Sequence, residues 1–328
     1  MPEAQTNDSN CKLCGGTTLL KVSDVAPEAI AKVYASMFCI DLCAVGCELP
    51  VKAISMLRCT NCELRQFKPD WIGSPGLYEA LQQFPWYYQE SKYEFQVAKK
   101  LVRPGNSVLE VGCATGNFRQ HLPSDITYAG LEFNQRAIDA ARRRGVDVSA
   151  LPLDQMAKTR PATFDCVFAF QVLEHVPQPR AFLLDMLSAA KPGGLIVFSV
   201  PNEDSFLRYE VNNVTNLPPH HATRWSDATF ERLGSLIGAQ LVDVAHEPLT
   251  PDHRRAYASA QIWRVISSTL AVGRNGVSPS ASNKLARGLI ALAGLPIRLW
   301  MAVFPLALRG HTVVVTLRKG VSCHSTTS

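Results

Sequence analysis

Two pairs of cysteines near the N-terminus have the spacing of metal ligands. Cys11 and Cys14 form the stretch CKLC, and Cys59 and Cys62 form CTNC. A CxxC knuckle directs two thiolates at one ion, and two knuckles complete the tetrahedral sulfur set of structural zinc. One pair alone would suit redox chemistry and metal binding equally, so the second pair decides between them. We expect these four cysteines to hold one structural Zn²⁺.

Three more cysteines lie between the two pairs. Cys39, Cys43 and Cys47 recur at i, i+4 and i+8, which places them on one face of a helix. We expect them to be small apolar side chains buried in that helix. Because the two CxxC pairs stand farther apart than in short zinc ribbons, these three cysteines are the alternative zinc ligands.

The composition is that of a globular protein with one large domain and a smaller one. The chain has 328 residues, ten cysteines and a formal net charge of +5 that is spread along its length. A small, scattered charge provides no basic patch, so we expect no nucleic-acid partner. The N-terminal stretch MPEAQTNDSN has no charged-then-apolar signal pattern. We therefore expect a cytoplasmic protein whose cysteines stay reduced.

A glycine turn follows a short apolar strand that begins at Ser107. The stretch reads SVLEVGCATGNF, and a strand, a glycine turn and a helix in succession let the backbone approach a ligand closely. A dinucleotide fingerprint has glycines at its first, third and sixth positions. Counted from Gly112, the third position is Ala114 and the sixth is Asn117, while Gly116 comes one place early. The spacing therefore weakens the prediction of a nicotinamide cofactor.

The same turn resembles motif I of the class I S-adenosylmethionine-dependent methyltransferases, written acidic-x-Gly-x-Gly-x-Gly. Glu110, Gly112 and Gly116 fit this pattern, and Ala114 replaces the middle glycine with another small residue. Later strands and helices of the family are matched in order by FDCVFAFQVLEHV at 164–176, KPGGLIVFSVPN at 191–202, WSDATFERLGSLIGA at 225–239 and HTVVVTLRK at 311–319. The resemblance implies an S-adenosylmethionine-dependent methyltransferase.

The predicted fold class is α/β. Runs such as Val108–Val111, Cys166–Phe170 and Leu195–Val200 are continuously apolar, as in strands buried on both faces of a parallel sheet. Amphipathic stretches such as NQRAIDAARRR separate them, so strands and helices alternate. With the resemblance, this predicts the Rossmann-like seven-stranded sheet of class I methyltransferases, with ligands bound beyond the carboxyl ends of the strands.

The resemblance places S-adenosylmethionine at that edge of the sheet. Glu132 ends a strand about twenty residues beyond Gly112, where a carboxylate accepts both ribose hydroxyls. Asp154 either accepts from the adenine amino group or caps a helix. Glu174 and His175 are expected to shape the methionine end of the cofactor. The expected cofactor-binding residues are Glu110, Gly112, Cys113, Ala114, Gly116, Glu132, Phe133, Asp154 and Gln171.

The stretch LPPHHAT at 217–223 places two prolines before two adjacent histidines. Neighbouring side chains of an extended loop point apart, so a shared metal ion is the least favoured interpretation. A rigid lid is the second. The loop follows the fifth strand at the cofactor edge and precedes a helix with its N-cap at Ser226. We expect His220 or His221 to be the catalytic base, with Tyr88 as a further catalytic candidate.

The N-terminal segment and its continuation, LRQFKPDWIGSPGLYEALQQFPWYYQESKYEF, resemble a bacterial group of methyltransferases with a zinc-binding N-terminal domain. That group includes sugar C-methyltransferases and proteins of surface-polysaccharide gene sets, which implies a small-molecule or sugar-linked acceptor. An RNA methyltransferase with a zinc ribbon is an alternative, but FQVLEH stands where an Asn-Pro-Pro-Tyr type motif would be needed. A non-catalytic zinc-containing scaffold is the alternative from another class, and the intact Gly112, Gly116 and Glu132 count against it.

An insertion separates the last two strands, which normally form a hairpin in this fold. It includes the apolar stretch GLIALAGLPIRLWMAVFPLAL at 288–308. Arg298 and two prolines interrupt this stretch, and both ends of the insertion must return to one sheet, which excludes a single membrane crossing. We expect a helical hairpin packed on the protein, with residues 286–308 as a surface for a membrane interface or a protein partner.

The chain thus divides into five expected parts. They are a zinc-binding domain at 1–75, an aromatic helical linker at 76–106, a methyltransferase core at 107–248 and 311–319, a helical insertion at 249–310 and a disordered tail at 320–328. The localisation that follows is cytoplasmic, and peripheral to the inner membrane if the insertion contacts lipid.

Overall fold

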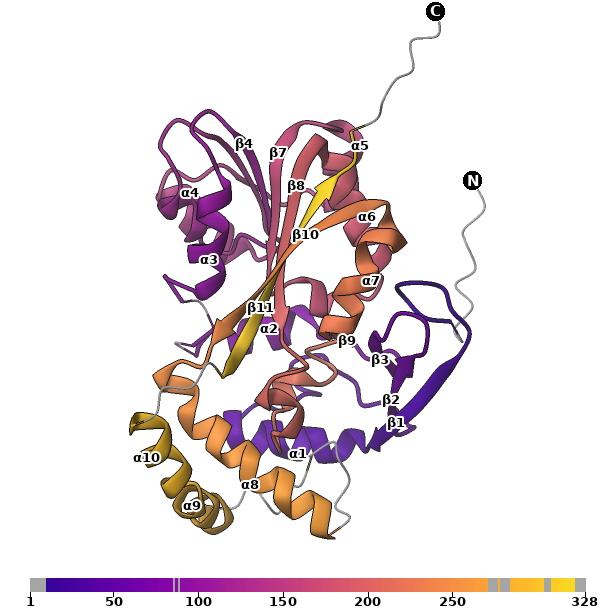
Figure 1. Ribbon diagram of the computed structural model, residues 1–328, viewed down its shortest axis with the longest axis vertical. Helices are drawn as coiled ribbons and strands as arrows, with labels where there is room; N and C mark the ends of the chain where they lie inside the picture. Colours follow the sequence, from indigo (N-terminus) through magenta and orange to yellow (C-terminus); the bar gives the residue numbers. More distant parts are fainter. Residues whose placement is uncertain are drawn as a thin grey trace, which may run out of the picture.

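A computed structural model describes residues 10–84, 86–87, 89–270, 277, 284–303 and 308–321. Within these residues the strands form a seven-stranded sheet and a four-stranded sheet. The large sheet occupies the upper half of the molecule in Figure 1, and the small sheet lies below it with the N-terminal helices. The strands of the large sheet lie almost entirely within the residues predicted for the core, and the small sheet combines three strands from the predicted N-terminal domain with one from the predicted core.

The large sheet confirms the predicted α/β fold. Its strands, in spatial order, are β10 (Ala239–Pro248), β11 (Arg309–Lys319), β8 (Ala190–Pro201), β7 (Phe164–Phe170), β4 (Ser107–Val111), β5 (Thr127–Leu131) and β6 (Val148–Ser149). The five strands from β8 to β6 pair in parallel, and β11 runs antiparallel between β8 and β10. The last two strands form the expected hairpin, although they are far apart in sequence.

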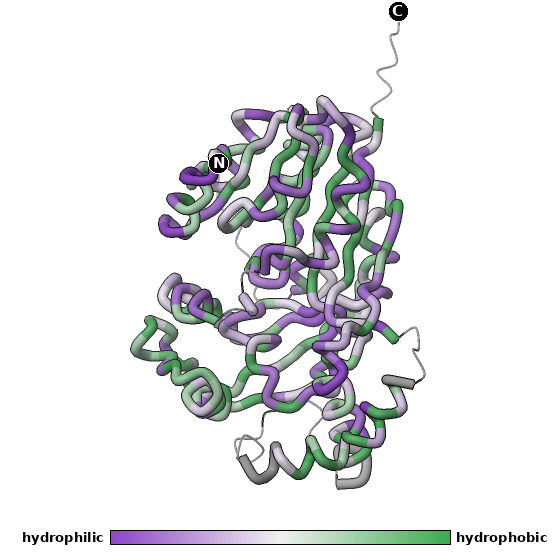
Figure 2. The backbone as a smooth tube through the Cα atoms, turned by 90° about the vertical axis from the view of Figure 1, so that its left-hand side faces the viewer, coloured by the Kyte–Doolittle hydropathy of each residue, from purple (hydrophilic) through white to green (hydrophobic). Residues whose placement is uncertain are grey.

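Helices cover both faces of this sheet (Figure 1). One face carries α3 (Tyr93–Ala98) and α4 (Gln135–Arg143), and the other carries α5 (Leu153–Thr159), α6 (Pro179–Ala189) and α7 (Asp227–Ile237). Side chains of the central strands point alternately into these two layers, so the core forms two separate apolar clusters. Figure 2 shows apolar residues running along the strands through the upper half of the molecule. Burial on both faces explains why these strands read as continuous apolar runs.

Single-turn 3₁₀ helices occupy several connections. They are η1 (Lys99–Leu101), η2 (Phe118–His121), η3 (Leu173–His175), η4 (Phe206–Tyr209), η5 (Val214–Asn216) and η6 (Pro251–His253). Two of them matter for the site: η3 follows β7, and η5 leads into the histidine loop. Both lie beyond the carboxyl end of a parallel strand, where ligands bind in this kind of sheet.

One strand of the small sheet comes from the part of the chain that was predicted to form the large domain. Its order is β1 (Leu19–Val25), β2 (Ile54–Cys59), β3 (Arg65–Lys68) and β9 (Thr223–Arg224), with α1 (Pro27–Phe38) and α2 (Pro75–Leu81) beside it. The strand β9 follows the histidine loop directly and pairs with β3. The buried carboxylate of Glu203 lies 3.6 Å from Arg65 and 3.5 Å from Arg224, one arginine from each of these strands. The N-terminal domain is therefore joined to the core by backbone pairing and by ion pairs.

The helix predicted through Cys39, Cys43 and Cys47 is wrong. Helix α1 ends at Phe38, because Cys39 adopts a left-handed conformation with φ of 56°. Cys39 and Cys43 are exposed, and Cys47 is buried against Ser74. These cysteines therefore share no helical face, and the four-cysteine cluster described below does not include them.

The insertion contains α8 (Arg254–Leu270), α9 (Lys284–Ala293) and α10 (Leu295–Val303) at the lower end of the molecule (Figure 1). Helix α8 packs on η4, where Ala260 joins a small apolar cluster with Phe206 and Leu207. Among the described residues, no helix is long and apolar enough to cross a membrane. This agrees with the expected helical insertion, part of which lies outside the described residues.

Candidate cofactor pocket and metal centres

The turn after β4 has the backbone of a close-approach loop. Gly112, Ala114 and Gly116 have φ values of 71°, 48° and 76°, a region that costs an L-residue with a Cβ roughly 1–2 kcal/mol. A Cβ added to Gly112 would lie 2.5 Å from Cγ2 of Val172, so only glycine fits there. Ala114 occupies the position of the family's middle glycine in a strained but attainable conformation. These residues form the cradle expected for a ligand against the main chain.

Glu132 lies at the end of β5, opposite this turn. Its Oε2 accepts a hydrogen bond from the backbone N–H of Ala114 at 2.9 Å. Its Oε1 accepts from the N–H groups of Phe133 and Asn134 at 2.8 and 2.9 Å. Three backbone donors therefore fix the carboxylate between the first two strands of the sheet, where the ribose site was expected.

The other expected cofactor residues are distributed around this edge. The ring of Phe133 is 74% exposed beside Glu132, whereas Cys113 is buried. Gln171 ends β7 with φ of 54°, and its backbone N–H donates to Ser199 at 2.9 Å. Asp154 lies in the first turn of α5, whose N-cap is Pro152, and pairs with Lys158 at 2.9 Å. The alternative role of Asp154 as a helix cap is therefore wrong.

Glu110 is buried within the sheet. Its Oε2 accepts a hydrogen bond from the hydroxyl of Tyr128 on the neighbouring strand. Burial raises the pKa of Glu110 to about 8, because desolvation disfavours the charged form. The carboxyl group is thus held inside the sheet, on the strand that leads into the glycine turn.

The four expected zinc ligands sit on two knuckles of the same shape. In the first, Gly15 N–H donates to Cys11 O at 2.9 Å, and Cys11 N–H donates to Gly16 O at 2.8 Å. In the second, Glu63 N–H donates to Cys59 O and Cys59 N–H donates to Leu64 O, both at 3.0 Å. Both Gly15 and Glu63 have positive φ. The repeated geometry turns each pair of thiols toward a common centre.

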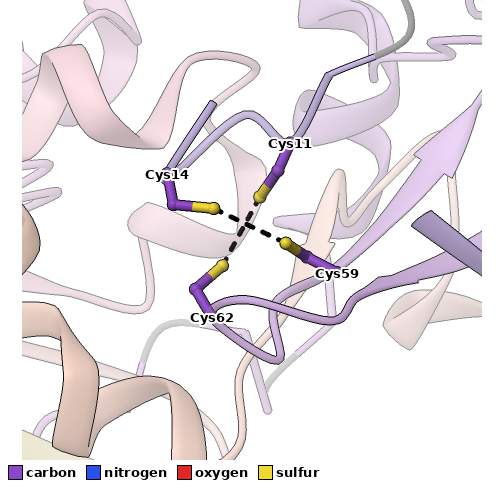
Figure 3. A group of neighbouring side chains, drawn as sticks. All are labelled: Cys11, Cys14, Cys59 and Cys62. Atoms are coloured by element: carbon purple, nitrogen blue, oxygen red, sulfur yellow. Dashed lines mark hydrogen bonds between the residues drawn. The ribbon is translucent and has the colours of Figure 1, made fainter. Parts of the chain in front are cut away.

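The sulfur atoms of this cluster are close enough to share an ion. The Sγ atoms of Cys11 and Cys62 are 3.5 Å apart, as are those of Cys14 and Cys59 (Figure 3). All four sulfurs lie within 4.8 Å of one another, and ligands of a tetrahedral site with bonds of about 2.3 Å lie about 3.8 Å apart. The contact with the Cys62 thiol lowers the pKa of Cys11. Four converging sulfurs fit Zn²⁺.

A cluster of three histidines lies beyond the carboxyl ends of β7 and β8. His175 comes from η3, and His220 and His221 come from the loop that precedes β9. One ring nitrogen from each histidine lies within 4.8 Å of the others. The rings of His220 and His221 stack with centroids 4.7 Å apart and an interplanar angle of 21°. The premise that these neighbouring side chains point apart is therefore wrong, and sequence reasoning missed the third histidine as their partner.

Two members of the histidine cluster, His220 and His221, are buried, and His175 is half-buried. Burial lowers the pKa of His175 to about 4 and that of His220 to about 3, and it lowers the pKa of His221 well below its usual value. The ring of Tyr78 lies 5.5 Å from His175 and 5.7 Å from His220. The expected catalytic residue Tyr88 lies outside the described residues.

Comparison with known proteins decides the family. A methyltransferase domain matches residues 86–244. The ubiquinone biosynthesis O-methyltransferase of Paraburkholderia xenovorans (strain LB400) is 30% identical over 164 residues, which cover 44% of this chain and 71% of that protein. The chain belongs to the class I methyltransferases. The predicted family of this methyltransferase is therefore confirmed, and its large sheet confirms the predicted seven-stranded fold.

Two further comparisons concern other methyltransferases. The ubiquinone biosynthesis O-methyltransferase of Bordetella bronchiseptica is 32% identical to the methyltransferase over 112 residues, which cover 31% of the chain but only 46% of that relative. A solved S-adenosylmethionine-dependent methyltransferase from Archaeoglobus fulgidus aligns over 74% of this methyltransferase and 100% of that chain, with 16% identity and a TM-score of 0.47.

Proposed function

We propose that this methyltransferase moves a methyl group from S-adenosylmethionine to a hydroxyl oxygen of a small molecule. The observation that carries the proposal is the turn after β4, whose positive φ values hold the main chain of Gly112, Ala114 and Gly116 at the edge of the sheet, beside the carboxylate of Glu132. When bound, S-adenosylmethionine supplies an electrophilic methyl group attached to a positive sulfur. Alignment and exclusion of water are the tasks of the surrounding residues.

Glu132, Phe133 and Gln171 are the proposed contacts to this donor. The three backbone hydrogen bonds to Glu132 orient its carboxylate, which retains acceptor capacity for the ribose hydroxyls. Phe133 presents an open aromatic face to an adenine ring. Asp154 is proposed to accept from the adenine amino group, since its carboxylate lies at the surface, where its ion pair with Lys158 is exposed to solvent.

The acceptor class rests on two lines of support. The names of the relatives specify O-methylation in ubiquinone biosynthesis, which favours a hydroxyl acceptor. The N-terminal cysteine cluster, seen together with the methyltransferase core, favours the glycan-pathway acceptors of the zinc-bearing group. A sugar-linked hydroxyl satisfies both lines, and a phenolic hydroxyl satisfies the first alone.

The proton of the acceptor hydroxyl must leave as the new oxygen–carbon bond forms and the sulfur–carbon bond breaks. A neutral imidazole of the histidine cluster is suited to accept it. We therefore retain His220 and His221 as proposed catalytic residues. In this role, His220→Ala or His221→Ala lowers turnover by roughly 10²–10⁴ fold while cofactor affinity stays near wild type.

The cysteine cluster is proposed to hold a structural zinc ion. All four sulfurs belong to protein ligands, which is the closed arrangement of structural rather than catalytic sites. The ion would fix the two knuckles at the base of the small sheet, because Cys59 is the last residue of β2. Its function is to stabilise the domain that pairs with β9.

The insertion is proposed to contact a membrane surface. Leu292, Leu299 and Trp300 are 67%, 60% and 48% exposed, and Arg298 belongs to the same helix as the last two. An apolar face with a neighbouring cation suits the interface of an anionic bilayer. Co-sedimentation with anionic vesicles tests this, and a Leu299→Glu variant is expected to remain in the supernatant.

The decisive experiment for the methyltransferase activity has two steps. Isothermal titration calorimetry should show tighter binding of S-adenosylmethionine than of NAD. Release of S-adenosylhomocysteine is then measured with sugar nucleotides, phenolic quinone precursors and small RNAs as acceptors. Binding without turnover on any acceptor would support the non-catalytic scaffold, and turnover on RNA would support the RNA methyltransferase.

A further inference from the structure

The histidine cluster has the hydrogen-bonding pattern of a prepared metal site. His175 Nδ1 lies 2.6 Å from the carbonyl oxygen of His220, and His220 Nδ1 lies 2.8 Å from that of Thr215. A carbonyl oxygen only accepts, so each Nδ1 must carry the proton and donate. In a neutral ring the other nitrogen, Nε2, then presents its lone pair.

His221 is held in the same way. Its Nδ1 lies 3.1 Å from the side-chain oxygen of Asn216, so Nδ1 donates and Nε2 keeps a lone pair. Donation of one ring N–H to an oxygen is the outer-shell contact that orients histidines on metal ions. Three different oxygen atoms thus set one tautomer in all three rings. Hydrogen bonding within the cluster cannot satisfy three lone pairs, because no Nε2 carries a hydrogen.

Glu174 adds a carboxylate to this group. Its side chain is 1% exposed, and neither of its oxygens has a hydrogen-bond partner among the described residues. Its Oε1 lies 4.0 Å from Nε2 of His175 and 4.0 Å from Nε2 of His221. Nε2 of His220 is also buried, and it too has no hydrogen-bond partner among the described residues. Buried polar atoms are normally paired, so these orphaned acceptors lack a cation or a donor.

We propose that His175, His220, His221 and Glu174 bind a second divalent transition-metal ion, of the zinc class, so that in the metal-bound protein the Nε2 atoms of His220 and His221 are ligands and the role of proton acceptor proposed above applies only to the metal-free cluster. Imidazole ligands favour zinc, iron, nickel and copper over magnesium and calcium. Ligands of a tetrahedral ion with bonds of about 2.1 Å lie about 3.4 Å apart, so the 4.0 Å separations close by about half an ångström on binding. The carboxylate balances one of the two positive charges of the ion.

This ion would tie the cofactor edge to the N-terminal domain. Val172, the side chain that faces Gly112, lies two residues before Glu174. The backbone N–H of Ala222, next to His221, donates to Glu174 O at 2.7 Å, and β9 follows at once. The metal site therefore joins the segment after β7 to the loop after β8 at the point where the two domains meet.

The test is metal analysis of the full chain, purified without chelator and dialysed against Zn²⁺. We expect two zinc ions per chain in the wild type and one in His221→Gln, which keeps a polar side chain of similar reach. Cys59→Ser should also retain one ion. His121→Gln is the matched control, since His121 Nε2 contacts the carbonyl of Glu90 away from the cluster, and it should keep two.

Cobalt substitution identifies which site is filled. In Cys59→Ser loaded with Co²⁺, the spectrum should show ligand-field bands without the sulfur-to-metal charge transfer that thiolates produce. Glu174→Gln, which preserves shape, should weaken zinc binding by at least about tenfold. One ion per chain in the wild type, unchanged in His221→Gln and absent from Cys59→Ser, would overturn the proposal. These readouts do not depend on turnover, so they remain decisive if the methyltransferase activity is absent.

Discussion

The close approach of Gly112 to Val172 gives a prediction whose size follows from the structure. Gly112→Ala places a Cβ at φ of 71° and 2.5 Å from Val172 Cγ2. The left-handed conformation costs about 1–2 kcal/mol, and overpacking adds about 1–3 kcal/mol. We therefore expect the free energy of unfolding to fall by about 2–5 kcal/mol. The measurement is urea denaturation followed by circular dichroism on zinc-loaded protein.

Two variants separate the conformational cost from the steric cost. Gly105 has φ of 77° and nothing within 4 Å of a built Cβ, so Gly105→Ala should lose only the conformational part, about 1–2 kcal/mol. Val172→Ala removes the methyl group that clashes. The double variant Gly112→Ala, Val172→Ala should therefore be more stable than the sum of the two single changes by about 1–3 kcal/mol. If Gly112→Ala cost no more than Gly105→Ala, and Val172→Ala gave no rescue, the close-approach explanation of this glycine would be refuted.

Three further predictions concern cofactor, zinc and pH. Glu132→Ala should weaken S-adenosylmethionine binding at least about tenfold by calorimetry, because hydrogen bonds to a charged acceptor contribute about 1.5–3 kcal/mol each; unchanged affinity would remove Glu132 from the site. Cys59→Ser should lose the cysteine-bound zinc and destabilise the small sheet, whereas Cys43→Ser should keep the ion; a cobalt-loaded Cys59→Ser that kept the full sulfur-to-metal charge transfer of the wild type would redirect the assignment to other thiolates. The pKa of Glu110 rises from 4.5 to about 8 on folding, so the native state holds a proton that the unfolded chain releases, and wild-type stability should fall as pH rises through this range. Burial also raises the pKa of Glu174 to about 8 and that of Glu210 to about 7, so Glu110→Gln should show a smaller fall than the wild type, and an identical pH profile would contradict the assignment.

Much of the fold could be predicted because its signals are local. The apolar run Leu195–Val200 predicts a buried strand wherever it stands in the chain, and each CxxC pair predicts a metal-binding turn from only four residues. The hairpin of β10 and β11 was predicted across the insertion because the family resemblance supplied the order of the strands. In each case the sequence contains the physical cause of the structure.

The errors arose where the cause lies elsewhere in the chain. The residue that ends α1 in a left-handed conformation is Cys39 and not a glycine, so its position carries no stop signal, although Gly46 between Cys43 and Cys47 is unfavourable for the predicted helix. The histidine cluster depends on contact between residues 175 and 220, which the pairing of β9 with β3 helps to establish. In an extended loop, adjacent side chains point apart, whereas in the structure the rings of His220 and His221 stack on each other. The adjacent pair alone does not reveal that His175 lies beside it.

The pairing of β9 with β3 also bears on how this protein is made. Arg65 pairs with Arg224 in that ladder, so the edge of β3 remains open during synthesis until the ribosome has delivered most of the large sheet. Contacts of such long sequence separation close late and slowly, and an open strand edge is a template for wrong partners. The N-terminal domain thus emerges before the large sheet but is completed after most of it. Expressed without the core, it should expose that edge and tend to aggregate.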